Sequence, residues 1–214
     1  YFGDMGCRVT DHALEYVFYN PADDAKINTI IAKALKNEKI SNDETEKYQT
    51  VLLTFLASEY SKRDWTMQIH YSALRNNNSN MYSKLGPDTG FDCLATYNCA
   101  EGIVAFLDSL NKNNILPKTI FYSLNPADNT MIGSVIGSFQ GPGVFGKIQQ
   151  GASWWFNDSK YGIVNQLTNI ANLSILGNIL GMVTDSRSFL SYPRHEYYRR
   201  ILCNFIDKLV ENGE

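Results

Sequence analysis

Apolar side chains recur at helical spacing along much of the chain. In the N-terminal part they share one face of a predicted helix: Ile27, Ile30, Ile31, Ala34 and Leu35. Ser41 and Glu44 then fit the S-x-x-E pattern, in which hydroxyl and carboxylate cap each other's free backbone N–H groups, so a second helix should begin there. Caps and apolar stripes predict three more helices, beginning near Asn98, at Asn157–Asp158, and at Ser191 with Pro193 in the first turn.

Short stretches rich in strand-forming residues lie between these helices. The predicted strands are Met5–Thr10, Trp65–His70, Thr119–Leu124, Ile148–Trp155 and Ile179–Thr184. Gly151 weakens the fourth of them. After the second strand, the Asn76–Asn78 run and Gly86–Asp88 predict a long loop.

Strands and helices therefore alternate. Three expected strand ends, at Ser123, Ser153 and Asp185, follow one another at intervals of about 30 residues, the size of a β-α-β unit. Such units form either a doubly wound open sheet or a closed eight-stranded barrel. The sequence has no G-x-G-x-x-G or G-x-x-x-x-G-K-[ST] run, which favours the α/β barrel. Since such barrels run to about 250 residues, we expect that some strands are missing from this chain.

Composition narrows the function classes. With 44% hydrophobic residues the chain should form a folded core, and a net charge of −3 with no basic stripe speaks against nucleic acid as a partner. The stretch from Tyr161 to Thr184 lacks charged residues, but it carries too many Asn, Gln, Ser and Thr side chains for a membrane span. The four cysteines have no CxxC spacing, so we expect a reducing, cytoplasmic location.

In a barrel of this kind the active site lies at the carboxyl ends of the strands. The candidates at such positions are Asp11, His12, His70, Trp154, Trp155, Asp185 and Arg187. Asp185 is a suitable hard ligand for a divalent metal, and Arg187 can bind a carboxylate through two parallel hydrogen bonds.

Each candidate also has a purely structural interpretation. His70 can be a hydrogen-bonded core or loop histidine, and Asp185 with Arg187 can be a local ion pair. The two tryptophans can be packing residues, or an aromatic wall against a sugar. His195, in the first turn of the last helix, is typical of a surface residue. No G-x-S-x-G, H-E-x-x-H or local Cys-His signature is present, so protease chemistry lacks support.

Five strings of the sequence closely resemble the uronate isomerase family, also called glucuronate isomerase. They are GCRVTDH at 6–12, MQIHYSALRNNN at 67–78, LGPDTGFD at 85–92, SWWFND at 153–158 and TDSRSFLSYPRHEYYRR at 184–200. They follow one another in a single consistent order between residues 6 and 200, so the resemblance extends over nearly the whole chain. The resemblance implies the fold of the metal-dependent amidohydrolases, a distorted (β/α)8 barrel, with this chain as one partial domain over residues 1–214, roughly strands 4 to 8, and with strand 1 absent.

The resemblance also implies an activity. The family converts D-glucuronate to D-fructuronate, and D-galacturonate to D-tagaturonate, by moving a proton between C2 and C1, in hexuronate catabolism. A divalent metal ion, zinc by preference, would polarise the substrate oxygens. The implied partner is a small-molecule hexuronate, and neither nucleic acid nor a membrane is expected. Assembly into a homo-oligomer is compatible with the resemblance.

Roles for single residues follow from the matched strings. Asp185 matches the metal ligand of the last strand, and the implied catalytic residues are Arg187, His70 and Asp11. The implied substrate-binding residues are Trp154, Trp155, Arg75 and His12.

One departure bears on activity. The family's first strand carries an H-x-H metal pair, and its histidine-tyrosine segment follows soon after, yet the sequence has no H-x-H. We therefore expect that this chain is a fragment that is inactive by itself. Two alternatives stay open: an amidohydrolase-type metal-dependent hydrolase, against which the missing strand-four lysine argues, and a non-catalytic barrel remnant.

Overall fold

The computed structural model describes residues 1–186 and 188–214. The chain forms two compact units. Unit 1 comprises Tyr1–Thr10, Tyr16–Met67 and Asn98–Thr119, and unit 2 comprises Asp11–Glu15, Gln68–Tyr97 and Ile120–Glu214. The strands β1 (Val9–Ala13), β2 (Thr66–Tyr71) and β5 (Thr119–Ser123) begin in unit 1 and end in unit 2.

Unit 1 is built on three helices that the apolar spacing largely predicts: α1 (Asp24–Leu35), α2 (Asn42–Lys62) and α4 (Ala100–Lys112). The predicted capping box is confirmed, because the Glu44 backbone N–H donates to Ser41 Oγ and the Ser41 N–H donates to the Glu44 carboxylate. The predicted side-chain cap at Asn98 is wrong, since Cys99 is the N-cap of α4 and makes no such bond.

Glu44 also joins α2 to α1, because Lys33 Nζ lies 2.8 Å from its carboxylate. The Lys33 hydrogen bond, followed by the one from the Ser41 backbone, lowers the pKa of Glu44 to about 2. Since the pKa is depressed in the folded state, this carboxylate stabilises the fold fully above its unfolded pKa, and the contribution disappears as the pH falls towards 2.

We predict that Glu44→Gln destabilises the protein most near neutral pH and less at about pH 3, where the unfolded-state carboxyl is protonated and the folded-state carboxylate begins to be. The measurement is the urea midpoint of wild type and variant at about pH 7 and about pH 3. The gap between the two midpoints should narrow in acid, and a gap of the same size at both pH values would show that the charge of Glu44 plays no part.

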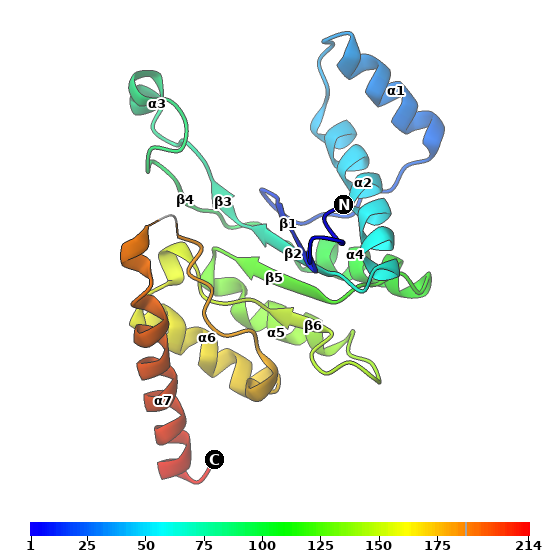
Figure 1. The fold of residues 1–214 in the computed structure, drawn as a ribbon. Coiled ribbons are helices and arrows are strands. Elements are labelled where there is room, and N and C mark those ends of the chain that lie inside the picture. Colours follow the sequence, from blue (N-terminus) through cyan, green and yellow to red (C-terminus); the bar gives the residue numbers. More distant parts are fainter. Residues whose placement is uncertain (187) are drawn as a thin grey trace. The chain divides into compact units, whose positions relative to one another are not determined.

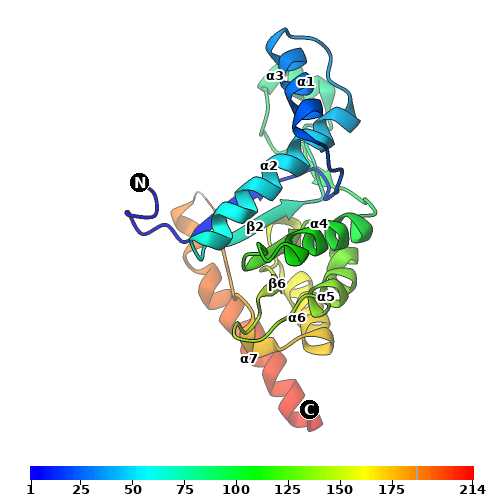
Figure 2. The ribbon, with the colours of Figure 1, turned by 90° about the vertical axis from the view of Figure 1, so that its right-hand side faces the viewer.

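Unit 2 carries a four-stranded parallel sheet in the order β1-β2-β5-β6, with β6 at Ile148–Gln150. The helix α5 (Asn129–Gly137) lies between β5 and β6 in the sequence, and α6 (Lys160–Leu173) and α7 (Arg194–Asn212) follow β6. α6 packs between α5 and α7 (Figures 1 and 2). Short 3-10 turns separate these elements: Pro126–Asp128, Trp155–Asn157, Leu176–Asn178 and Phe189–Ser191. The apolar faces of α6 and α7 meet around Ile163, Leu167, Ile201 and Phe205.

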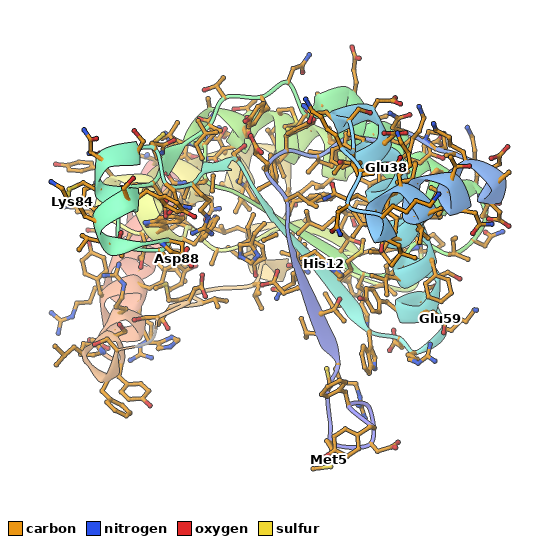
Figure 3. All side chains as sticks on the ribbon, turned by 90° about the horizontal axis from the view of Figure 1, so that it is seen from above. Met5, His12, Glu38, Glu59, Lys84 and Asp88 are labelled. Carbon is orange, nitrogen blue, oxygen red and sulfur yellow. The ribbon has the colours of Figure 1, made fainter. Side chains whose placement is uncertain are left out.

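The predicted long loop after β2 contains regular structure that the sequence did not suggest. β3 (Ala73–Leu74) pairs antiparallel with β4 (Cys93–Leu94), and α3 (Ser79–Leu85) lies at the tip of the arm that they form (Figure 1). Figure 3 shows Lys84 and Asp88 at this tip.

Several predicted boundaries in unit 2 are wrong. Ile179–Thr184 is not a strand, and the Leu180 N–H donates to the side chain of Gln149 instead of a backbone carbonyl. The cap of α6 is the Ser159 hydroxyl and not Asn157–Asp158, and α7 begins at Arg194 instead of Ser191. The fourth predicted strand is confirmed only over Ile148–Gln150. No helix among the described residues is long and apolar enough to cross a membrane.

Candidate active site

A cavity of about 480 Å³ opens beside the carboxyl-terminal ends of β1 and β2 in unit 2. Five of the predicted site residues line it: Asp11, His70, Arg75, Trp154 and Asp185. The other lining residues are Ala13, Leu14, Glu15, Tyr71, Ala73 and Leu74. Residues far apart in the sequence therefore meet at one cavity, as expected for the strand ends of a parallel sheet.

His70 is the most firmly held of these residues. Its Nδ1 lies 2.7 Å from Asp11 Oδ1, and its ring stacks on that of Tyr122 at 4.2 Å between centroids with the planes 10° apart. The ring of Trp154 meets it edge-on at 4.7 Å. With Nδ1 occupied by a carboxylate, Nε2 is the ring nitrogen left for a ligand or a proton.

Asp11 and His12 lie inside β1 and not after it, which corrects the predicted strand boundary. Neighbouring residues of a strand point to opposite faces, so Asp11 and His12 cannot both face the cavity. Asp11 lines the cavity and His12 does not. Burial lowers the pKa of His12, and the charge of Asp11 opposes that shift.

The aromatic wall comes from the segment after β6. Trp154 is 8% exposed, and its buried indole N–H has no hydrogen-bond partner among the described residues. Trp155 does not line the cavity, but its ring carries the Arg75 guanidinium 4.9 Å from its centroid. Arg75 Nη1 also lies 3.4 Å from Asp92 Oδ2 and 3.9 Å from Asp88 Oδ1, so three contacts hold Arg75 beside the cavity.

Asp185 reaches the cavity from an irregular segment with a left-handed backbone, at φ 45°. It is exposed and does not follow a strand, which corrects its predicted position at a strand end. Trp155, at φ 53°, shares this uncommon conformation. Such backbone strain concentrates at functional sites, where surrounding structure holds it in place. The predicted site residue Arg187 lies outside the described residues, and His195 is exposed on α7 as predicted.

Reasoning from the sequence missed Tyr122, which is 3% exposed and touches His70 directly. Burial, followed by the negative charges of Asp11 and Asp185, raises the pKa of the Tyr122 hydroxyl, so that hydroxyl stays protonated. It donates to Gln68 Oε1 at 2.7 Å. Two features of the sequence could have indicated Tyr122. Gln68 shares a strand face with His70, and Gly151 interrupts a predicted strand, which marks a place where another group approaches the backbone closely.

The described part of the chain has no group of three His, Cys, Asp or Glu side chains placed to hold a metal ion. Asp185 and the Nε2 atom of His70 are suitable donors at the cavity, and both lie on its lining. These residues fit part of a coordination sphere for a divalent metal, and the remaining ligands would have to come from elsewhere.

Comparison with known proteins agrees with this arrangement. A family model described as glucuronate isomerase matches residues 1–214. Uronate isomerases of Lachnospira eligens and Clostridium acetobutylicum are each 55% identical over all of this chain, which covers 46% of either relative. The chain thus spans about half the length of the curated relatives it matches.

Solved structures give the same result. The crystal structure of a uronate isomerase from Thermotoga maritima matches this chain with a TM-score of 0.90 at 32% sequence identity. The match covers 99% of this chain and 46% of the Thermotoga maritima chain. A glucuronate isomerase from Caulobacter crescentus, at 23% identity, shares the fold with a TM-score of 0.87. The prediction of an α/β, barrel-type fold is confirmed.

Proposed function

The chain belongs to the glucuronate isomerase family, and from that premise we propose that the whole protein isomerises hexuronates at the cavity beside His70. The observation that carries the proposal is the meeting of Asp11, His70, Arg75, Trp154 and Asp185 at one cavity. In this proposal the whole protein completes a distorted (β/α)8 barrel, to which this chain contributes roughly strands 4 to 8.

The reaction interconverts an aldose and a ketose. C2 loses a proton and its hydroxyl proton to become the carbonyl carbon, while C1 gains a proton and its oxygen becomes a hydroxyl. His70 is the proton carrier, because Asp11 holds Nδ1 and leaves Nε2 to take the proton from C2 and return it at C1. The two proton transfers pass through an enediol-type intermediate.

Trp154 and Arg75 bind the substrate. Trp154 presents an apolar ring to a sugar face and a buried N–H to one of its oxygens. The Arg75 guanidinium, held by Asp92 and Trp155, supplies the positive charge that a uronate carboxylate requires. The resemblance also assigns Arg187 to the site, whereas its assignment of His12 to substrate binding is not kept in the proposal, because His12 lies on the other face of β1 from Asp11.

A divalent ion, zinc by preference, is part of the proposal. Asp185 would hold it, and the ion would act as a Lewis acid on the substrate oxygens. Because the described residues supply fewer than the three protein ligands usual for catalytic zinc, we expect the 214-residue chain alone to bind zinc weakly and to lack turnover.

The proposed cytoplasmic location is supported by thiol chemistry, since Cys7, Cys93 and Cys203 are free thiols in the structure.

The first test of the proposal is the formation of a ketose from a free uronate. When the intact protein is incubated with D-glucuronate or D-galacturonate, isomerisation gives a ketose of unchanged mass. A hydrolase acting on amides or lactones adds the mass of water to its own substrates and leaves the free uronate untouched. Formation of the ketose supports the isomerase, and an unchanged uronate would contradict it.

Arg75→Ala should raise KM for a uronate by about 10- to 100-fold with a smaller effect on kcat, because a hydrogen bond to a charged group contributes about 1.5–3 kcal/mol. The matched control is Arg199→Ala, which removes an exposed arginine that forms an ion pair with Glu196 on α7. Steady-state kinetics measure both constants. If KM is unchanged in Arg75→Ala, another group binds the carboxylate.

A further inference from the structure

We propose that Tyr122 is a positioning residue for His70, held in place by Gly151 and Gln68. The inference rests on the proposed function only in taking His70 as the proton carrier. The geometry that carries it is a three-layer stack, with the imidazole of His70, the phenol ring of Tyr122 and the backbone of Gly151 lying one against the next.

The first contact of the stack fixes the plane of the His70 ring. The χ2 torsion of histidine is broad, so the hydrogen bond that Nδ1–H donates to Asp11 Oδ1 anchors one atom without fixing the ring plane. Tyr122 lies face to face with the imidazole at 4.2 Å and 10°, which prevents rotation towards that side. Trp154, edge-on at 4.7 Å, is a second ring against the same imidazole. Nε2 therefore points in one direction.

The second contact explains the glycine directly after β6. A Cβ atom at Gly151 would lie 2.2 to 2.4 Å from three ring atoms of Tyr122, closer than non-bonded carbons can approach. Gly151 cannot move away, because its N–H donates to Phe121 O at 2.8 Å and its carbonyl accepts from Gln166 Nε2 at 2.7 Å. The absence of a side chain at Gly151 is what admits the Tyr122 ring.

Gln68 fixes Tyr122 at its other end. The Tyr122 hydroxyl donates to Gln68 Oε1 at 2.7 Å, and Gln68 stands two residues before His70 on the same face of β2. The ring that supports His70 is thus tied back to the strand that carries His70. A buried ring that serves only as core filling would require neither the hydroxyl contact nor a coplanar stack.

The test uses variants of the intact protein that act on each contact. In Gly151→Ala the new methyl group displaces the Tyr122 ring, and Tyr122→Leu removes the stack outright. Misplacement of a catalytic group by about 1 Å can cost up to 100-fold, so kcat should fall by about 10- to 100-fold in both, with KM changed far less. Tyr122→Phe keeps the ring and should retain most of kcat. Gly137→Ala, where an added Cβ meets nothing within 4 Å, is the matched control.

A second readout does not depend on turnover. The Tyr122 ring lies over the imidazole and shifts the His70 carbon-bound proton resonances upfield, so Gly151→Ala and Tyr122→Leu should move these resonances downfield in NMR spectra, while Tyr122→Phe should not. Thermal unfolding is measured for every variant. If Gly151→Ala does not fold, Tyr122→Leu and Tyr122→Phe carry the same comparison.

The outcomes separate this proposal from the proposed function. If the wild type makes no ketose, the proposed function fails, and the NMR comparison still tests the stack. If the wild type is active, moved resonances with unchanged kcat would overturn the positioning role. Unmoved resonances in Tyr122→Leu would overturn the stack itself.

Discussion

Replacing Asp185 with asparagine should lower hexuronate turnover by the intact protein at least about 100-fold, because Lewis-acid catalysis contributes several kcal/mol and depends on its charged ligands. Asparagine keeps the shape of the side chain and removes its charge. Asp185 lines the cavity in a left-handed backbone conformation that asparagine also tolerates, so the fold should not suffer.

Turnover and bound metal are measured together on the same preparations of this variant. We expect both to fall in Asp185→Asn, whereas Asp207→Asn, which changes an exposed aspartate on α7, should leave both unchanged. Full turnover in Asp185→Asn would remove Asp185 from the site.

His70→Asn should lower kcat about 100-fold or more, the scale of a positioned acid–base group. Asp11→Asn should cost less, about 10-fold, since the amide oxygen still accepts from Nδ1–H but no longer stabilises the charged imidazolium. Because the two side chains act as one unit, the double variant should be no slower than His70→Asn. Losses that multiply in the double variant would show that Asp11 and His70 act separately.

The helices that the sequence predicted best are those whose signals are local. The capping box at Ser41–Glu44 and the apolar stripe of α1 depend only on neighbours within the same helix, and both appear as expected. α5 was missed because it is only nine residues long and contains Gly133 and Gly137, which lower its intrinsic helix propensity. Ile179–Thr184 has the composition of a strand, but a strand must also pair with a neighbouring strand, and composition does not show whether such a neighbour is present.

Part of the candidate site could also be predicted from the sequence. Strand-end positions and the family resemblance pointed to Asp11, His70, Arg75, Trp154 and Asp185, which all line one cavity. Tyr122 and Gly151 were missed because their contacts cross from one strand to the next. Such contacts depend on the register between strands, which no single strand's sequence determines.

The proposed reaction moves a proton between C2 and C1 of a hexuronate at this cavity. The most direct measurement follows D-glucuronate deuterated at C2 as the intact protein converts it, with and without a chelator. We predict a ketose in which the deuterium has left C2, for C1 or for solvent, at a rate slower than that of the unlabelled sugar and dependent on metal. A labelled sugar recovered unchanged, or a product that keeps its deuterium on C2, would contradict the account.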